Sequence, residues 1–201
     1  SKYMPETYLR QAMQAGQHIF GENTVQDAMT KLQLLRDPGN EWHFIGHLQT
    51  NKAQHIAGNF SWLHTLDSLK LANRLERHCQ TRQAELNVLV QVNISNDPDK
   101  HGLPVDRVFG FIEELLAAGH EGLALRGLMT IGQRGAATAE RQREFAALRE
   151  LSEACATRFG RSRFLELSMG MSGDFELAIR EGASIVRVGG AIFGPRPLSP
   201  P

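Results

Sequence analysis

Two segments near the C-terminal end of the chain contain glycines, and the first also contains two serines. The first reads Leu-Ser-Met-Gly-Met-Ser over residues 167–172, and the second reads Val-Gly-Gly-Ala-Ile-Phe-Gly over residues 188–194. Glycine lets the backbone approach a ligand closely, while hydroxyls and amides donate hydrogen bonds to an anion. Together the segments indicate a site for a phosphorylated ligand, with simple turn formation as the alternative reading of the glycines.

Two cationic residues are candidates to join this site. Arg187 lies inside the apolar run 185–188. Burying an unpaired guanidinium costs free energy. We therefore expect Arg187 to have a hydrogen-bond partner in the interior of the fold or at its rim. Lys2, taken alone, is typical of a solvated terminal lysine. It becomes a candidate nucleophile only if the fold places it at the mouth of a cavity.

Other patterns give weaker signals. Four histidines lie between residues 43 and 64: His43, His47, His55 and His64. They form no helical His-x-x-x-His pair and have no carboxylate set nearby, so we predict solvated or capping roles and no metal site. Met169 and Met171 are predicted to fill the core. Neither a Ser-His-Asp arrangement nor a Walker loop is legible.

The composition limits the classes of function. The chain has 201 residues, of which 41% are hydrophobic, with 22 basic and 22 acidic residues. This excludes global disorder, and the balanced charge argues against a general binder of nucleic acid or membrane surfaces. No apolar run is long enough to span a membrane, and no signal sequence is seen. Cys79 and Cys155 suit reduced thiols rather than a disulfide, so we expect a cytoplasmic protein.

Strand and helix signals alternate along the whole chain. Strands are predicted near residues 19, 43, 63, 91, 127, 166 and 187. Helices are predicted over 5–15, 24–35, 68–83, 138–158, 173–181 and 191–193, with a short one starting near residue 51 and another ending at Gly119. Strict alternation predicts a parallel sheet with right-handed crossovers.

This pattern favours an α/β fold of the (β/α)₈ TIM-barrel type. A barrel needs eight strands, and only seven are counted, so we expect a first strand before Ser1. Residues 1–201 would then form a single, N-terminally truncated barrel domain. The alternative is an open doubly wound sheet, which normally carries a glycine fingerprint after its first strand. In a barrel, the functional residues lie at the carboxyl ends of the strands.

At these same strand ends the sequence resembles the YggS/PROSC family of pyridoxal-phosphate homeostasis proteins. The matching segments are Ser1-Lys2 and residues 20–23, 42–52, 92–95, 126–129, 167–174 and 186–194. They cover nearly the whole chain in the right order. The resemblance implies a barrel like the N-terminal domain of alanine racemases.

The resemblance also implies the ligand and its contacts. Pyridoxal 5′-phosphate would be held as a Schiff base on Lys2, with Asn23 near the cofactor. Arg187 would face the pyridine nitrogen. The phosphate would be surrounded by Ser168, Ser172, Gly189 and Gly190. Family members usually carry threonine at the position of Gly190 and a small residue at the position of His101, so both positions depart from the pattern.

The implied function is intracellular vitamin B6 homeostasis without robust catalysis. A cationic Arg187 beside the ring nitrogen would disfavour its protonation and weaken the ring as an electron sink. Racemases also use a second domain, and none is legible before the chain ends at Pro201. The alternatives are a small racemase or lyase that uses pyridoxal phosphate, and a binding module for another phosphorylated metabolite. Expected partners are the cofactor, amino acids or apo-enzymes that depend on the cofactor, with a monomeric state.

Overall fold

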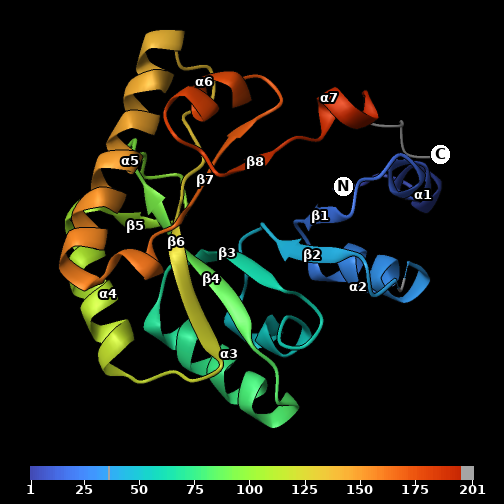
Figure 1. Cartoon of the computed structure of the whole chain (residues 1–201), viewed down its shortest axis with the longest axis horizontal. Coiled ribbons are helices and arrows are strands. Elements are labelled where there is room, and N and C mark those ends of the chain that lie inside the picture. The colour runs from blue at the N-terminus through green and yellow to red at the C-terminus, as the bar shows by residue number, and fades with distance from the viewer. Residues whose placement is uncertain (36, 196–201) are drawn as a thin grey trace.

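The protein forms a parallel sheet that curls into a nearly closed barrel (Figure 1). The computed structural model describes residues 1–35 and 37–195. The strands follow one another in the order β1 (Ile19–Glu22), β2 (Glu41–Phe44), β3 (Trp62–Leu66), β4 (Leu86–Asn93), β6 (Leu123–Met129), β7 (Glu166–Met171) and β8 (Ile185–Arg187). All seven strands predicted from the sequence are confirmed. An additional two-residue strand, β5 (Leu103–Pro104), pairs with β4 and was not predicted.

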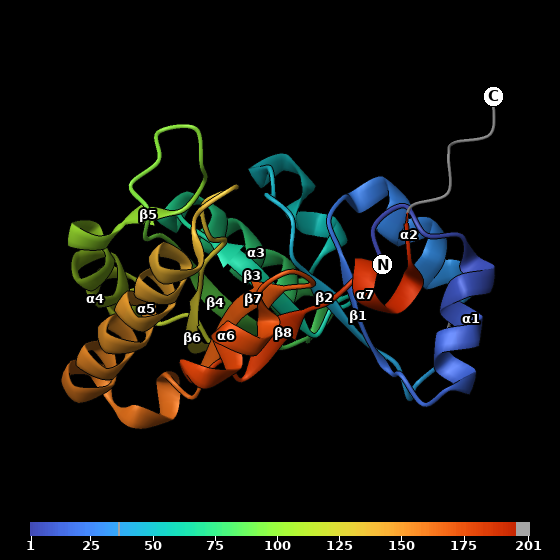
Figure 2. The same cartoon turned by 90° about the horizontal axis from the view of Figure 1, so that it is seen from above.

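Helices alternate with the strands and cover the outer side of the sheet (Figures 1 and 2). They are α1 (Glu6–Gln14), α2 (Val25–Leu34), α3 (Leu69–Arg82), α4 (Val108–Ala117), α5 (Thr138–Phe159), α6 (Phe175–Arg180) and α7 (Gly190–Phe193), with 3₁₀ turns at Thr50–His55, Val105–Arg107 and Arg161–Arg163. The Ser68 hydroxyl caps α3 by accepting from the Leu71 amide. In the described part of the chain, none of the helices combines the length and apolarity needed to cross a membrane.

The core lies on both sides of the strands, as expected for a parallel sheet covered by helices. In β4, Val88, Leu89 and Val90 point alternately to the two faces, and all three are inaccessible to solvent. The expectation of reduced thiols is confirmed, since Cys79 and Cys155 are both free and buried. Burial raises the pKa of each thiol to about 11, so neither carries a reactive thiolate near neutral pH.

The strand order decides between the two architectures that the sequence left open. Neighbours in the sheet follow the chain order without a reversal, whereas a doubly wound sheet reverses at a switch point. The barrel prediction is therefore confirmed. Among the described residues, β8 and β1 share no ladder, so one seam of the barrel stays open. The strand expected before Ser1 would fit that seam and stays a prediction, and residues 196–201 lie outside the described part.

Candidate functional site

The loops after β1 and β2 meet closely at the carboxyl end of the barrel. Asn23 follows β1, and Gly46 follows β2. A Cβ atom on Gly46 would lie 1.9 Å from the Asn23 carbonyl oxygen, so only glycine fits there. This contact fixes the backbone of Asn23 at the barrel mouth, where the family resemblance expects it.

The segment that carries Lys2 is attached to the edge of β1. The Ser1 nitrogen donates to the Gly21 carbonyl over 2.7 Å. The Lys31 ammonium, which is almost completely buried, donates to the Ser1 carbonyl over 2.7 Å and to Glu22 Oε1 over 2.9 Å. Within residues 1–35 and 37–195, Lys2 enters no ion pair; its Nζ lies 5.0 Å from the centre of the Tyr3 ring.

The charges around Lys31 are compensated inside this cluster. Burial raises the pKa of Glu22, although hydrogen bonds from Ser1 and Lys31 oppose the shift. For Asp27, burial acts in the same direction, but hydrogen bonds from Lys31 and the Tyr3 amide outweigh it and lower the pKa. The cluster therefore uses Lys31 as a structural cation and leaves Lys2 for other contacts.

Ser172 links the loop after β7 to the loop after β8. Its Oγ accepts from the Gly189 amide at 3.2 Å and from the Ala191 amide at 3.3 Å. The space around the two glycines is open: a Cβ on Gly189 would meet nothing within 4 Å, and one on Gly190 would meet only Ser172 Oγ at 3.7 Å. The structure thus brings Ser172, Gly189 and Gly190 together, with amides and a hydroxyl converging on one place.

Arg187 ends β8 immediately before this loop and is partly buried. Nη1 donates to Ser168 Oγ over 2.7 Å, and Nη2 donates to the Thr130 carbonyl over 2.8 Å. The expectation that Arg187 has partners is confirmed. Burial lowers the pKa of Arg187 to about 10, so it remains a cation at neutral pH.

Two histidines continue from Ser168 through the barrel interior. Ser168 Oγ lies 2.8 Å from His64 Nδ1, and His64 Nε2 lies 2.8 Å from His43 Nδ1. His43 Nε2 in turn lies 2.6 Å from Glu41 Oε1. The prediction of solvated or capping roles was wrong for His43 and His64, which are only 5% and 1% exposed. Burial lowers the pKa of both imidazoles.

Ser168 occupies a different place from Ser172. It is inaccessible to solvent, and its hydroxyl is engaged by Arg187 and His64. Ser168 therefore lies in the interior with its hydroxyl already bonded, and the phosphate contact expected for it stays a prediction. Met169 fills the core as predicted, but Met171 was predicted wrongly: it is 39% exposed because it follows Gly170 at the end of β7.

For His47, the prediction of a solvated role is confirmed in part. His47 is half exposed and stacks on His101, with 3.7 Å between ring centroids, while its Nδ1 lies 4.0 Å from Asp67 Oδ2. In the described ranges, no group of three or more His, Cys, Asp or Glu side chains is placed to hold a metal ion. His101 lies in the loop after β4, where family members usually carry a small residue. Through its stacking on His47, it packs on a neighbouring loop of the barrel mouth.

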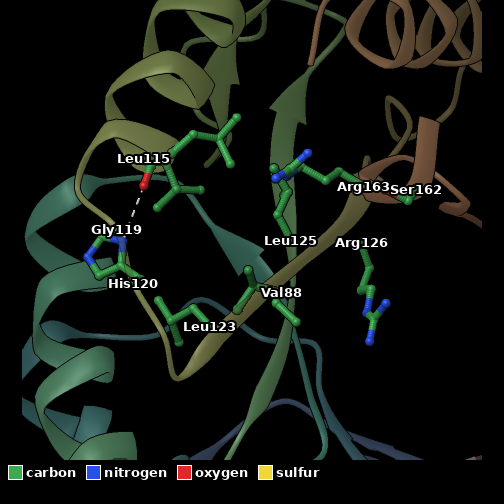
Figure 3. A pocket seen from close by; sticks show the side chains of 11 residues that line it. Val88, Leu115, Gly119, His120, Leu123, Leu125, Arg126, Ser162 and Arg163 are labelled. Atoms are coloured by element: carbon green, nitrogen blue, oxygen red, sulfur yellow. Dashed lines mark hydrogen bonds between the residues drawn. The ribbon is translucent and has the colours of Figure 1, made fainter. Parts of the chain in front are cut away.

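A pocket lies elsewhere on the molecule, beside α4 and the first halves of β4 and β6 (Figure 3). Val88, Leu115 and Leu125 form apolar walls, and Arg126 and Arg163 add charge. The strands run parallel, so their first halves lie at the opposite end of the barrel from Ser172 and Gly189. This pocket is separate from the candidate site.

Comparison with known proteins places this geometry in a family. Residues 6–197 match the family model described as alanine racemase, N-terminal domain. The pyridoxal phosphate homeostasis protein of Haemophilus influenzae is 40% identical over 201 residues, which cover 99% of this chain and 84% of that protein. The chain belongs to the pyridoxal phosphate homeostasis protein family. The homeostasis protein of Pseudomonas aeruginosa is 41% identical over a match that covers the whole of this chain and 84% of that protein.

Solved structures agree with this membership. PipY of Synechococcus elongatus with pyridoxal phosphate bound is 37% identical, with a TM-score of 0.89 over 96% of this chain and 90% of that one. The same protein without the cofactor gives a TM-score of 0.90. An alanine racemase of Clostridium difficile is 13% identical, with a TM-score of 0.73 over 98% of this chain and 50% of that one. This last likeness concerns the fold alone.

Proposed function

We propose that this protein binds pyridoxal 5′-phosphate and serves intracellular vitamin B6 homeostasis without robust catalysis. The observation that carries the proposal is the partly buried guanidinium of Arg187, held by Ser168 and Thr130 directly before the Ser172–Gly189 loop pair. A fixed cation lies beside backbone amides and a hydroxyl that can donate hydrogen bonds to an anion. This arrangement suits a ligand with a weakly basic ring nitrogen and a phosphate. The relatives' name and the cofactor-bound PipY structure support the same ligand.

The donor set fits the phosphate. The Gly189 and Ala191 amides now satisfy the Ser172 hydroxyl, and the same three groups can turn to phosphate oxygens. No side chain fills the space next to Gly189, so an anion of phosphate size can approach the backbone. We assign the phosphate to Ser172, Gly189 and Gly190, and we place Ser168 behind Arg187.

The aldehyde of the cofactor needs a primary amine. Lys2 supplies one from a segment whose backbone is fixed to β1 through Ser1 and Lys31. In both views, the N-terminus lies near α7, across the seam from β8 (Figures 1 and 2). We propose that Lys2 holds the cofactor as a Schiff base, with Asn23 beside it.

A carrier role follows from the electrostatics of Arg187. When bound, pyridoxal phosphate supplies an electron sink whose strength depends on protonation of its ring nitrogen. A guanidinium that stays charged at neutral pH opposes that protonation. The second candidate, a racemase or lyase, is favoured by the fold that the chain shares with alanine racemases.

The wider cellular role is proposed on the same basis. Pyridoxal phosphate would be stored on a monomer in the cytoplasm and passed to apo-enzymes, with amino acids acting as further ligands. Size-exclusion chromatography with light scattering, at several protein concentrations, tests the monomer. Transfer is tested by mixing the loaded protein with an apo-enzyme and following recovery of that enzyme's activity against free cofactor at the same concentration.

The direct test is the visible spectrum of the protein mixed with pyridoxal phosphate. We expect a yellow absorbance band that survives gel filtration and disappears on borohydride reduction. Lys2→Ala should lose the band, while Lys52→Ala is the matched control and should retain it. A module for another phosphorylated metabolite would give no band with either protein, and that result would overturn the proposal.

A further inference from the structure

Four hydrogen bonds form a continuous polar chain from Arg187 through the barrel interior. The chain passes from Arg187 Nη1 to Ser168 Oγ, from there to His64 and His43, and ends on Glu41, with donor–acceptor distances of 2.7, 2.8, 2.8 and 2.6 Å. It joins β8, β7, β3 and β2. Barrel interiors are usually filled by branched apolar side chains. A chain of polar side chains through the interior is therefore unusual and indicates a specific role.

The proton positions along the chain follow from the two ends. Arg187 can only donate, so Ser168 Oγ accepts from it and uses its own hydrogen to donate to His64 Nδ1. His64 then carries its proton on Nε2 and donates to His43 Nδ1. His43 likewise carries its proton on Nε2 and donates to the Glu41 carboxylate. Every donor meets an acceptor in this direction.

The reverse direction does not satisfy the same groups. If His64 donated from Nδ1, Ser168 Oγ would accept from both Arg187 and His64. Its hydroxyl hydrogen would then have no acceptor among the contacts of the described residues. An unsatisfied buried hydroxyl costs free energy, so the chain runs one way, from guanidinium to carboxylate.

The electrostatics agree with two neutral imidazoles between opposite charges. Burial, His43 and Arg187 all lower the pKa of His64, and burial lowers that of His43 against the influence of Glu41. The Trp62 ring stacks on His43, with centroids 5.4 Å apart and a 21° interplanar angle, which shields this part from water. The cation at one end is partly buried, and the Glu41 side chain at the other end is 43% exposed.

We propose that Glu41, His43, His64 and Ser168 are positioning residues that hold the Arg187 guanidinium in the orientation that meets the cofactor ring. The cofactor contact rests on the function proposed above; the direction of the chain does not. Each imidazole is fixed as the Nε2–H tautomer, so the orientation of Arg187 is coupled to a carboxylate three side chains away. Hydrogen bonds in series strengthen one another, which makes the chain more rigid than its separate pairs.

The first measurement uses the protein without cofactor. Long-range ¹H–¹⁵N correlation spectra of histidine-labelled protein distinguish Nε2–H from Nδ1–H imidazoles. We expect His43 and His64 to be neutral Nε2–H tautomers near neutral pH. Ser168→Ala should leave His64 with a mixture of tautomers, while Ser172→Ala should leave both imidazoles unchanged.

The second measurement links the exposed end of the chain to the cofactor. Glu41→Ala removes the terminal acceptor at a half-exposed position, whereas Glu41→Gln keeps an acceptor oxygen. We expect Glu41→Ala to mix the His43 tautomers and to weaken pyridoxal phosphate binding by between about twofold and tenfold, the scale of one hydrogen bond. Glu41→Gln should retain the tautomer and most of the affinity, and His55→Ala is the control outside the chain.

The outcomes separate the two proposals. An Nδ1–H tautomer at His43 or His64 would overturn the one-way chain. So would a Glu41→Ala protein with unchanged imidazole spectra and unchanged cofactor affinity. If the wild-type protein bound no pyridoxal phosphate while its tautomers were as expected, the proposed function would fail and the chain itself would stand.

Discussion

The Lys31 ammonium lies 2.7 Å from the carbonyl oxygen of Ser1, the residue directly before Lys2. Because Lys31 also contacts Glu22 and Asp27, its charge is compensated within the protein. Two lysines near the barrel mouth therefore have separate tasks. Lys31 fixes the backbone, and Lys2 is the lysine that we propose for the ligand.

Borohydride trapping should place the cofactor label on Lys2. A Schiff base needs a primary amine, and the backbone beside Lys2 is fixed to β1 through Ser1. We expect peptide mapping of the reduced protein to find the label on the peptide that contains Lys2, and Lys2→Ala to remove it. A label on Lys52 or Lys100 in the wild-type protein would contradict the assignment.

Gly190→Thr should tighten cofactor binding several-fold. The new hydroxyl would add a hydrogen bond to the phosphate, an interaction worth about 1.5–3 kcal/mol when well formed, of which water now supplies part. The site has room, since a Cβ there would meet only Ser172 Oγ at 3.7 Å. Losing the extra backbone freedom of glycine acts in the same direction.

The dissociation constant for this variant is best measured in a Lys2→Ala background, where no covalent bond masks the contribution of the phosphate. Gly110→Thr is the matched control, because a Cβ there would meet nothing within 4 Å and Gly110 lies in α4, away from the loop pair. Unchanged or weaker binding by Gly190→Thr would mean that the phosphate is held elsewhere.

Racemisation of alanine and serine should be absent or marginal. The charged Arg187 opposes protonation of the cofactor ring, so a carbanion at the substrate α-carbon is poorly stabilised. Exchange of the α-proton with deuterated water, followed by NMR with the loaded protein, gives the rate. Steady turnover near that of a typical enzyme, about 1–1000 per second, would refute this expectation.

Stability should fall as the pH drops below 6.5. The pKa of His64 is well below its ordinary value of 6.5 in the folded state, so below pH 6.5 the unfolded chain binds a proton that the folded chain excludes. Stability is therefore complete above pH 6.5 and decreases by up to about 1.4 kcal/mol per pH unit for this residue. His43 adds to the slope in the same direction.

Urea unfolding at a series of pH values checks this linkage. His64→Gln should lower the overall stability but reduce the slope below pH 6.5, whereas His55→Gln serves as the substitution control. An unaltered slope in His64→Gln would show that His64 does not carry the linkage.

Most of the fold could be predicted from the sequence because long, buried strands leave strong apolar runs. The run over β4 is the clearest example, since Val88, Leu89 and Val90 are buried on alternate faces of the sheet. β5 could not be predicted in this way, since it has two residues, one of them Pro104. Its pairing depends on how the loop after β4 returns to that strand, which no local pattern encodes.

The site was only partly predictable, for a related reason. Arg187 and the glycines after β8 stand out by residue type, and the structure brings Ser172 to them. The interior chain pairs His64 with Ser168, 104 residues later, and such a distant pairing is invisible in one sequence. A usable signal was present: His43 and His64 each sit among apolar residues of a strand, which indicates burial rather than solvation.

The edges of β8 and β1 flank the position of the strand expected before Ser1, and this arrangement gives ligand binding a mechanical consequence. Lys2 lies beside the β1 edge, and Arg187 with Gly189 lies at the β8 edge. A single small molecule bonded to both would act as a clasp across the two ends of the sheet. Such a ligand binds only when β1 and β8 are both in place. It would therefore suppress local opening of these two strands. Slower amide hydrogen exchange in β1 and β8 than in the ligand-free protein would then report loading, with β4 and β6 at the centre of the sheet as the internal reference.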